Sequence, residues 1–306
     1  MKKMILTKDL TRRFDGTVAV DRLNLEIAEG EIFGLLGPNG AGKTTTVRLL
    51  SCLIAPTSGE AIINGYKVGQ DDMQIRRIVG ILTESPGLYE RLDAYTNLEF
   101  YANLYEVENA PKQVERYLNM LGLWERRKEA VARFSKGMKQ KLAIARALIH
   151  EPKVLFLDEP TAALDPEASK VVRDFIEELK GEGRIIFLCT HNLDEAQRLC
   201  DRIGVLKTQL IAVDTPENLQ RQMFGRRMLI RLRQLTPEMM AAVRSLNLAT
   251  ALEQADNQLI LSLGDPETAT PIIVRRLVES GGDILQVTEL KHSLEEIYLN
   301  LIKEAQ

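Results

Sequence analysis

Alternating and continuous apolar segments predict a β-rich start to the chain. Ile5–Lys8 and Leu23–Ile27 have the patterning of half-buried strands, and Asp15-Gly16 between them is typical of a turn. The uncharged segment Ile32–Leu36 predicts a buried strand that leads into a glycine-rich run, and Thr46–Leu53 beyond it has helical periodicity. We therefore expect a β-layer followed by a strand, a glycine-rich loop and a helix.

The middle of the chain passes from a helical pattern to an α/β pattern. Periodicity from Ala94 to His150 is almost wholly helical, which predicts a helical subdomain inserted at about 86–150. Val154–Leu157 and Ile185–Cys189 are wholly apolar runs of the kind found in parallel strands covered on both faces, with a predicted helix at Pro166–Lys180 between them. These patterns predict an α/β fold with a parallel sheet core, an N-terminal antiparallel β-layer and the inserted helices.

After about Gln220 the pattern becomes that of a smaller α+β unit. Its predicted elements, in chain order, are strand Met228–Leu232, helix Pro237–Leu246, a strand near Thr250, strand Gln258–Leu263, helix Thr268–Ser280, strand Ile284–Leu290 and helix Ser293–Lys303. This β-α-β-β-α-β order is typical of a ferredoxin-like domain. We therefore expect one domain over residues 1–220 and an accessory domain of ferredoxin-like or related topology over 221–306.

Composition excludes several classes of protein. The 306 residues are 45% hydrophobic, enough for a buried core, and the net charge of −3 lacks the basic excess of a dedicated nucleic-acid binder. The longest apolar run has five residues, whereas a membrane span needs about 18 or more. Met4–Leu6 is too short for a signal-peptide core, which predicts a cytoplasmic location.

The odd number and spacing of Cys52, Cys189 and Cys200 favour buried thiols.

The glycine-rich run matches the phosphate-binding pattern G-x-x-x-x-G-K-[ST] at every fixed position. In this pattern, glycines let backbone N–H groups surround phosphate oxygens, Lys43 supplies a cation at the β- and γ-phosphates, and Thr44 can place its hydroxyl on Mg²⁺. Taken alone, the pattern is also compatible with a generic turn. The predicted nucleotide-binding residues are Gly37, Pro38, Asn39, Gly40, Ala41, Gly42, Lys43, Thr44 and Thr45.

Two carboxylates follow the predicted strand Val154–Leu157. Asp158 and Glu159 stand at its carboxyl end, where open α/β sheets bind ligands. Beside a phosphate-binding loop, Asp158 is the expected Mg²⁺ partner together with Thr44, and Glu159 is placed to polarise a water that attacks the γ-phosphate. The alternative for each is an acidic helix cap or turn residue. The pair favours nucleotide hydrolysis over simple nucleotide binding.

The segment Phe134–Lys141 indicates which class of P-loop protein this is. It resembles the Leu-Ser-Gly-Gly-Gln signature of ATP-binding-cassette (ABC) ATPases, and it precedes a helix that we expect to start at Met138. Taken alone, Ser135 and Gly137 are also compatible with an ordinary capped helix start. The resemblance implies that this serine and glycine contact the γ-phosphate held by the P-loop of a second subunit.

Further motifs of the ABC family follow in the expected order. Ala162–Asp165 resembles the D-loop, His191 resembles the switch histidine and is the expected second catalytic residue, and Phe14 occupies the position that stacks on adenine in the family. Taken alone, Phe14 is compatible with a core position and His191 with a satisfied loop histidine. The resemblance extends over residues 4 to about 215.

Two positions depart from the family pattern. Glu84 stands where the family's Q-loop glutamine is expected, and Lys136 replaces the first glycine of the signature. An oxygen of Glu84 can still bind Mg²⁺ or water, but its charge adds to those of Asp158 and Glu159 near the triphosphate. We therefore expect slower or differently coupled hydrolysis. A cation at Lys136 is electrostatically compatible with a phosphate nearby.

The resemblance implies a cytoplasmic ATPase subunit with ATP and Mg²⁺ as cofactors. It would work as a homodimer, or paired with a second cassette subunit, on separate transmembrane permease subunits at the inner face of the membrane. The Pro-Gly-Leu-Tyr run that begins at Pro86, together with the C-terminal unit, resembles the drug- and polysaccharide-export branch typified by the daunorubicin-resistance ATPases. The alternative is a soluble ABC regulator or nucleotide-sensing module without a membrane partner. Nothing in the sequence identifies a transported substrate.

Overall fold

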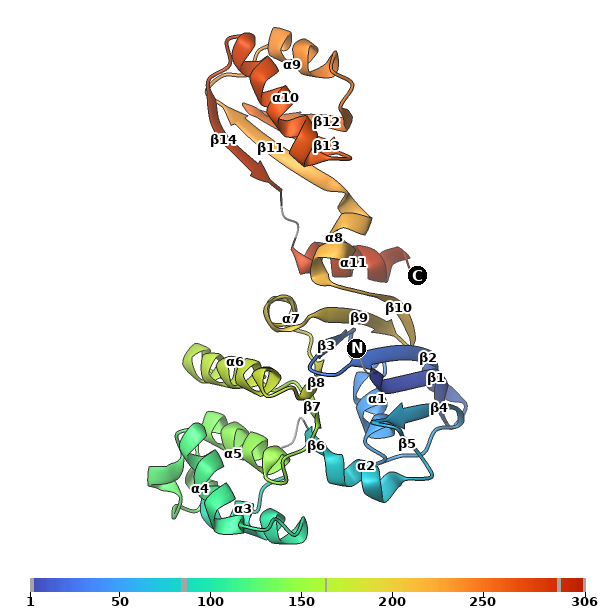
Figure 1. Cartoon of the computed structure of the whole chain (residues 1–306), viewed down its shortest axis with the longest axis vertical. Helices are drawn as coiled ribbons and strands as arrows, with labels where there is room; N and C mark the ends of the chain where they lie inside the picture. Colours follow the sequence, from blue (N-terminus) through green and yellow to red (C-terminus); the bar gives the residue numbers. More distant parts are fainter. Residues whose placement is uncertain (1–2, 84–86, 163, 291–292, 305–306) are drawn as a thin grey trace. The chain divides into compact units, whose positions relative to one another are not determined.

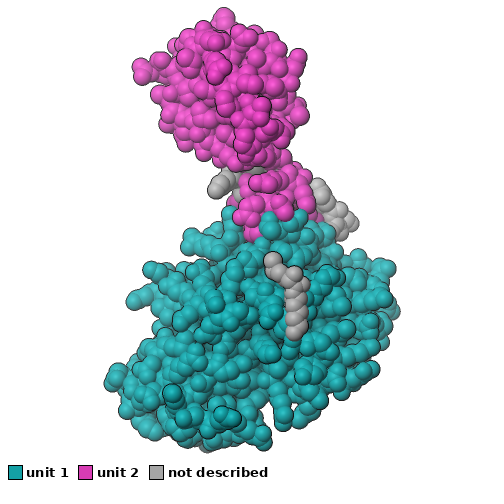
Figure 2. Space-filling model, in the orientation of Figure 1, with its two compact units in different colours: residues 1–215, 305–306 teal, residues 216–304 magenta. Residues whose placement is uncertain are grey.

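The computed structural model describes residues 3–83, 87–162, 164–290 and 293–304. The chain divides into two compact units, one extending to Thr215 and the other from Pro216 to Glu304 (Figure 2). Gln220, where the sequence pattern changes, lies within helix α8 (Pro216–Phe224) of the second unit.

The first unit combines two sheets with helices on both sides of the larger one (Figure 1). Its strands are β1 (Lys3–Phe14), β2 (Thr17–Ala28), β3 (Ile32–Leu36), β4 (Ser58–Ile63), β5 (Tyr66–Lys67), β6 (Val79–Leu82), β7 (Val154–Asp158), β8 (Ile185–Cys189), β9 (Arg202–Lys207) and β10 (Gln209–Asp214). Its helices are α1 (Lys43–Leu50), α2 (Asp72–Ile78), α3 (Ala94–Leu104), α4 (Ala110–Met120), the 3-10 turns η1 (Trp124–Arg126) and η2 (Val131–Arg133), α5 (Lys136–Leu148), α6 (Pro166–Gly181) and α7 (Leu193–Leu199).

The smaller sheet is the predicted antiparallel β-layer, with strand order β2-β1-β4-β5. Asp15 and Gly16, both at positive φ (44° and 85°), connect β1 to β2 in a two-residue hairpin that pairs Phe14 with Thr17. Positive φ at both positions is the requirement of a type I′ turn. The strands extend well beyond the segments that alternation alone marks, because the hairpin continues the pairing up to the turn.

The larger sheet has the strand order β10-β9-β3-β8-β7-β6. Neighbouring strands from β9 to β6 are parallel, and β10 adds an antiparallel edge. All residues of β3, β7 and β8 are buried, as their continuous apolar sequences predict. The predicted α/β fold class is therefore confirmed, and the carboxyl ends of β3, β7 and β8 lie side by side.

The core of the first unit lies between the two sheets, around α1. Val47, Leu49 and Leu50 of α1 pack in one apolar cluster with residues of both sheets. The ring centroid of Phe187 on β8 lies 5.5 Å from that of Phe33 and 5.4 Å from that of Phe156, which links three adjacent strands. This packing holds the glycine-rich loop, between β3 and α1, on a rigid support.

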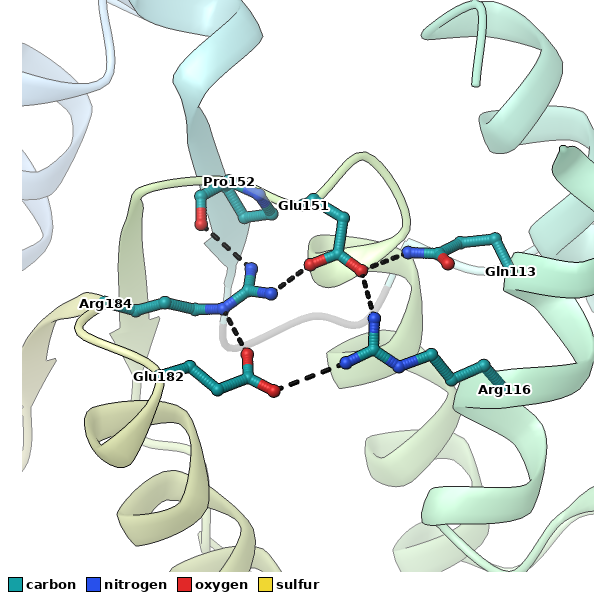
Figure 3. A network of polar contacts seen from close by, with 6 residues as sticks. All are labelled: Gln113, Arg116, Glu151, Pro152, Glu182 and Arg184. Atoms are coloured by element: carbon teal, nitrogen blue, oxygen red, sulfur yellow. Dashed lines mark hydrogen bonds and ion pairs between the residues drawn. The ribbon is translucent and has the colours of Figure 1, made fainter. Parts of the chain in front are cut away.

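The inserted helical subdomain is formed by α3, α4 and α5, which pack against one another. A network of polar contacts joins α4 to the amino-terminal ends of β7 and β8 in the central sheet (Figure 3). Glu151, just after α5, accepts hydrogen bonds from Gln113 and Arg116 of α4 and from Arg184, which precedes β8. Arg184 also donates to Glu182 (2.9 Å) and to the carbonyl of Pro152 (2.9 Å). The network therefore links α4 of the helical subdomain to the segment that precedes β7 and to the segment that precedes β8.

The second unit is an α+β sandwich of one sheet and two covering helices. Its strands are β11 (Arg226–Leu232), β12 (Ala249–Ala255), β13 (Gln258–Leu263) and β14 (Ile284–Glu289), and its helices besides α8 are α9 (Pro237–Arg244), α10 (Pro266–Glu279) and α11 (Leu294–Glu304). The sheet is antiparallel with order β12-β13-β11-β14, a split β-α-β arrangement. Alternate residues of β11 and β13 face α9 and α10 in one buried cluster, while α8 packs against α11.

Candidate functional site

The glycine-rich loop connects β3 to α1, and two of its glycines are required by close backbone contacts. A Cβ atom at Gly37 would lie 2.4 Å from the carbonyl oxygen of Leu206, and one at Gly42 would lie 2.3 Å from that of Ala19. Gly42 also has φ +104°, a conformation that side-chain-bearing residues rarely adopt. Helix α1 starts at Lys43, earlier than the periodicity at Thr46 predicts, because the loop closes directly onto the first helical turn.

The start of α1 is open to an anion. Among the described residues, no side chain caps its N-terminus and its first turn holds no acidic residue. Uncapped N–H groups and the positive end of the helix dipole form a binding site for phosphate. The side chain of Lys43 is 8% exposed, and its Nζ donates to the carbonyls of Gly37 (2.6 Å) and Pro38 (3.2 Å). The ammonium group is thus held within the loop.

A cavity of about 340 Å³ opens at the carboxyl edge of the central sheet. It brings together most of the residues that the sequence predicts for the site: Pro38, Asn39, Gly40, Ala41, Gly42, Lys43, Thr44, Thr45, Asp158, Glu159 and His191. Ala19 and Ala162 complete its lining. The cavity therefore joins the phosphate-binding loop to the acidic end of β7 and to the segment after β8.

Thr44 and Asp158 face each other in this cavity. The Thr44 hydroxyl donates to Asp158 Oδ2 at 2.9 Å, and Asp158 is 5% exposed at the end of β7. A hydroxyl and a carboxylate are hard oxygen ligands, and Mg²⁺ uses one or two such groups together with water and phosphate oxygens. The two residues therefore fit the predicted metal site.

Glu159 is held by several hydrogen bonds and has a rare backbone conformation. Its φ is +51°, and its N–H donates to the Cys189 carbonyl at 2.8 Å. The His191 N–H donates to Glu159 Oε1 at 3.0 Å, and His191 Nδ1 lies 2.7 Å from the same oxygen. The Thr190 hydroxyl lies 3.3 Å from Oε2. The carboxylate is therefore oriented by the segment that follows β8.

Three residues that sequence reasoning missed lie directly behind Glu159. Thr190 is fully buried, Glu195 of α7 is 2% exposed, and Thr161 contacts Glu195. Burial raises the pKa of the Glu195 carboxyl, and the nearby negative charge of Glu159 contributes in the same direction. No sequence pattern marked them, because the burial of Glu195 beside Ala196 and Leu199 becomes evident only with the packing of α7.

The signature-like segment lies apart from this cavity. Ser135 is the N-cap of α5, with its Oγ accepting from the Met138 N–H at 3.2 Å, and the helix starts at Lys136 rather than at Met138. A Cβ atom at Gly137 would lie 3.3 Å from that of Ala168 at the start of α6. Neither Ser135 nor Gly137 lines the cavity of the same chain, so the signature-like segment and the phosphate-binding loop are separate within the described part of the chain.

The remaining predicted residues lie outside the cavity lining. Phe14 ends β1, is 40% exposed and carries the Arg12 guanidinium 4.4 Å from its ring centroid. Gly37 takes part through its backbone carbonyl, which accepts a hydrogen bond from Lys43 Nζ. Glu84, the third predicted metal-binding residue, lies outside the described residues.

A phosphate-binding loop and two carboxylates at the carboxyl edge of a parallel sheet define a P-loop ATPase. Residues 20–162 match the family model described as ABC transporter. The chain is 34% identical to the bacitracin transport ATP-binding protein BcrA of Bacillus licheniformis over 99% of its own length and 98% of that protein. It is 35% identical to the daunorubicin resistance ATP-binding protein DrrA3 of Streptomyces coeruleorubidus, over 95% of this chain and 93% of that protein.

A comparison with solved structures leads to the same family. A solved structure of an ATP-binding subunit of an ABC transporter superposes with a TM-score of 0.68 and 32% identity, covering 72% of this chain and 94% of that one. The chain therefore belongs to the ATP-binding subunits of ABC transporters, and it is an ATPase of that family. Among the described residues, no helix is both long and apolar enough to cross a bilayer.

Proposed function

We propose that this chain powers an exporter as a homodimer bound to transmembrane permease subunits at the cytoplasmic face of the membrane. The observation that carries the proposal is the convergence of Lys43, Asp158 and Glu159 in one cavity. Family membership supports the pairing with permeases. Export is supported by the likeness to a daunorubicin resistance ATP-binding protein and to a fluoroquinolones export ATP-binding protein of Mycobacterium tuberculosis, which is 39% identical over 222 residues.

In this proposal, the glycine-rich loop and the start of α1 bind the phosphates. Within the described part of the chain, the start of α1 has no side-chain cap and lines the cavity, so its free N–H groups would receive a phosphate, and Lys43 adds a full positive charge at the same place. Nζ would exchange its bonds to the Gly37 and Pro38 carbonyls for phosphate oxygens. Phe14, exposed and backed by Arg12, is the surface on which an adenine ring would stack.

The acidic residues at the carboxyl end of β7 would carry out hydrolysis. Thr44 and Asp158 would hold Mg²⁺, which when bound neutralises charge on the β- and γ-phosphates. Glu159 accepts a proton from, or orients, a water next to the γ-phosphate, since its Oε1 is already fixed by His191. The side chain of His191 is 70% exposed in the chain alone, so it is free to contact the phosphate as well.

A dimer follows from the separation of the two phosphate sites. Ser135 and Gly137 form an exposed helix start that does not line the cavity of their own chain. A nucleotide in that cavity can therefore reach a Ser135 segment only on a second chain. Two identical chains arranged head to tail would complete each other's site by symmetric contacts. Lys136, also exposed, adds a cation to the face that would meet the γ-phosphate.

The helical subdomain presents a surface suited to the permease. We define the aromatic surface as Tyr89, Phe100, Tyr101, Leu104 and Tyr105, of which Tyr89, Phe100 and Leu104 are 47%, 45% and 64% exposed. The ring centroids of Tyr89 and Phe100 lie 5.3 Å apart, and both rings also pack against that of Tyr101. A hollow of about 230 Å³ lies beside them, lined in part by Tyr101 and Tyr105. Exposed apolar patches of this kind mark interaction sites.

Two further assignments belong to this proposal. The second unit, which contributes no residue to the nucleotide cavity, would support dimerisation or regulation. Glu84 would transmit the nucleotide state to the permease, with its extra negative charge slowing or altering the coupling.

The test is to look for a neighbouring gene that encodes a protein of several apolar spans and to reconstitute the chain with that membrane protein in vesicles. We expect wild-type chain to hydrolyse ATP and Lys43→Ala to lose hydrolysis and nucleotide binding, because the cation at the phosphates is gone. We also expect Phe100→Asp to lower co-purification with the membrane protein while leaving hydrolysis by the isolated chain unchanged. Val278→Asp, at an exposed apolar position of the second unit (57% exposed against 45% for Phe100), serves as the control.

Wild-type nucleotide affinity in Lys43→Ala would refute the assignment of the ATP site. Equal co-purification of Phe100→Asp and the Val278→Asp control would refute the aromatic surface as the docking site, while leaving the ATPase assignment intact.

A further inference from the structure

Glu195 is a buried acid for which the phosphate-binding motifs provide no role. It is the third residue of α7, after the N-cap Asn192, whose side chain accepts the Glu195 N–H at 3.1 Å. A glutamate in this position commonly bends back to accept the backbone N–H of the N-cap residue. Here the Asn192 N–H donates instead to the Thr190 hydroxyl at 3.0 Å. The Glu195 carboxylate is therefore released from its local capping role.

Both oxygens of that carboxylate accept hydrogen bonds from threonines next to the catalytic cavity. Oε1 accepts from Thr161 at 2.8 Å, and Oε2 accepts from Thr190 at 3.1 Å. Thr161 lies two residues after Glu159, and Thr190 immediately precedes His191. One side chain, 2% exposed, thus connects the two segments that carry the catalytic groups.

The Thr190 hydroxyl extends this connection to Glu159. It accepts the Asn192 N–H and lies 3.1 Å from Glu195 Oε2 and 3.3 Å from Glu159 Oε2. A hydroxyl has a single proton to donate, so its orientation depends on which carboxylate takes that proton. Glu195 and Glu159 therefore compete for this proton, and Glu195 is the nearer acceptor.

We propose that Glu195 is a positioning residue for ATP hydrolysis, which holds the Thr161 and Thr190 hydroxyls and thereby keeps in place the His191 segment, whose N–H donates to Glu159 Oε1. The inference rests on the proposed role of Glu159 as the group that acts on the attacking water. A glutamate suits this position because an ionised carboxylate only accepts hydrogen bonds, and both threonines donate to it. Glutamine at the same place would accept through one atom only.

The experiment compares steady-state hydrolysis by the full-length chain and its variants. We expect Glu195→Gln and Thr190→Val each to lower kcat by about ten-fold, the scale seen when an orienting partner of a catalytic group is removed, with KM for ATP changed by less than about two-fold. The double variant should lose no more than either single one, because both changes break the same connection. Asp194→Asn, exposed on the same helix, should leave kcat unchanged.

A Glu159→Gln background separates positioning from general stabilisation. There the residual kcat should not fall further on adding Glu195→Gln, whereas a general loss of structure would lower ATP affinity and melting temperature in both backgrounds. An unchanged kcat in both Glu195→Gln and Thr190→Val, or additive losses in the double variant, would overturn the inference. If Glu159→Gln itself keeps wild-type kcat, the proposed role of Glu159 has failed instead.

Discussion

At the residue scale, Glu159 shows how the site is prepared before any ligand enters. Its φ of +51° is costly for a side-chain-bearing residue, by roughly 1 kcal/mol. The bonds from His191 and the N–H contact to Cys189 hold it there. Strain kept in place by surrounding contacts is typical of catalytic positions. In the role that we propose for Glu159, its carboxylate would need no reorganisation when a water and a phosphate approach.

Two glycines of the phosphate-binding loop differ in how closely the neighbouring backbone approaches them. We expect Gly42→Ala to destabilise the fold by about 2 kcal/mol or more and to abolish nucleotide binding, because φ is +104° and the new Cβ would lie 2.3 Å from a backbone oxygen. Gly40 is the matched control in the same loop. At φ +82° it has open space around it, so Gly40→Ala should cost only about 1 kcal/mol.

Urea unfolding and binding of a fluorescent ATP analogue measure both variants. Equal loss of stability in the two would show that conformation alone matters at these positions and that the contact with Ala19 does not constrain the loop.

Sequence reasoning at this scale succeeds where chemistry depends on residue type and spacing. The fixed positions of the P-loop and the acids after β7 identify Lys43, Asp158 and Glu159, and the structure brings all three to one cavity. It fails where the role depends on burial. Thr161 and Glu195 look like ordinary surface residues in sequence, and only the packing of α7 shows them behind Glu159.

At the scale of elements, continuous apolar runs predict the central strands well. β8 has the predicted bounds, and β7 extends the predicted run by one residue to Asp158. β6, β9 and β10 were not predicted, because they are short or mix buried with half-buried positions. Helix α10 starts at Pro266, two residues before the prediction, since Asp265 caps it and proline suits the first turn.

The network around Glu151 is an element-scale contact with a pH dependence. Burial alone would raise the pKa of this carboxyl, but hydrogen bonds from Arg184 and Gln113 outweigh it and hold the pKa below its ordinary value. A carboxyl with a lowered pKa in the folded state stabilises the protein fully above about pH 4.3, and this contribution is lost as pH falls through the folded-state pKa.

We therefore expect Glu151→Gln to lower the free energy of unfolding by about 1 kcal/mol at pH 7, because Arg184, only 10% exposed, loses a charged partner. The difference from wild type should shrink below pH 4, where the wild-type carboxyl takes up a proton as well. Urea unfolding at the two pH values measures both.

Glu129→Gln is the control, since Glu129 forms an ion pair with Arg126 on the exposed surface. Its effect at pH 7 should be smaller, because solvent screens that pair. A deficit for Glu151→Gln that widens in acid would contradict the assigned direction of the pKa shift.

At the scale of the whole molecule, the arrangement of phosphate sites accounts for the link between hydrolysis and assembly. The P-loop cavity and the helix start at Ser135 are separate within one chain. ATP would therefore become part of the interface when two chains close on it. Cleavage of the γ-phosphate would remove that connection and favour separation, which gives a cycle of closing and opening for a permease to follow.

The most direct test of this account is light scattering of the isolated Glu159→Gln variant with and without MgATP. Glutamine keeps the size of the side chain but loses the carboxylate that acts on water, so we predict that a dimer accumulates with MgATP and that the protein is monomeric without it. Adding Ser135→Arg should abolish the dimer while nucleotide still binds, because Ser135 does not line the cavity of its own chain. A Glu159→Gln chain that stays monomeric with nucleotide bound would contradict the composite-site mechanism.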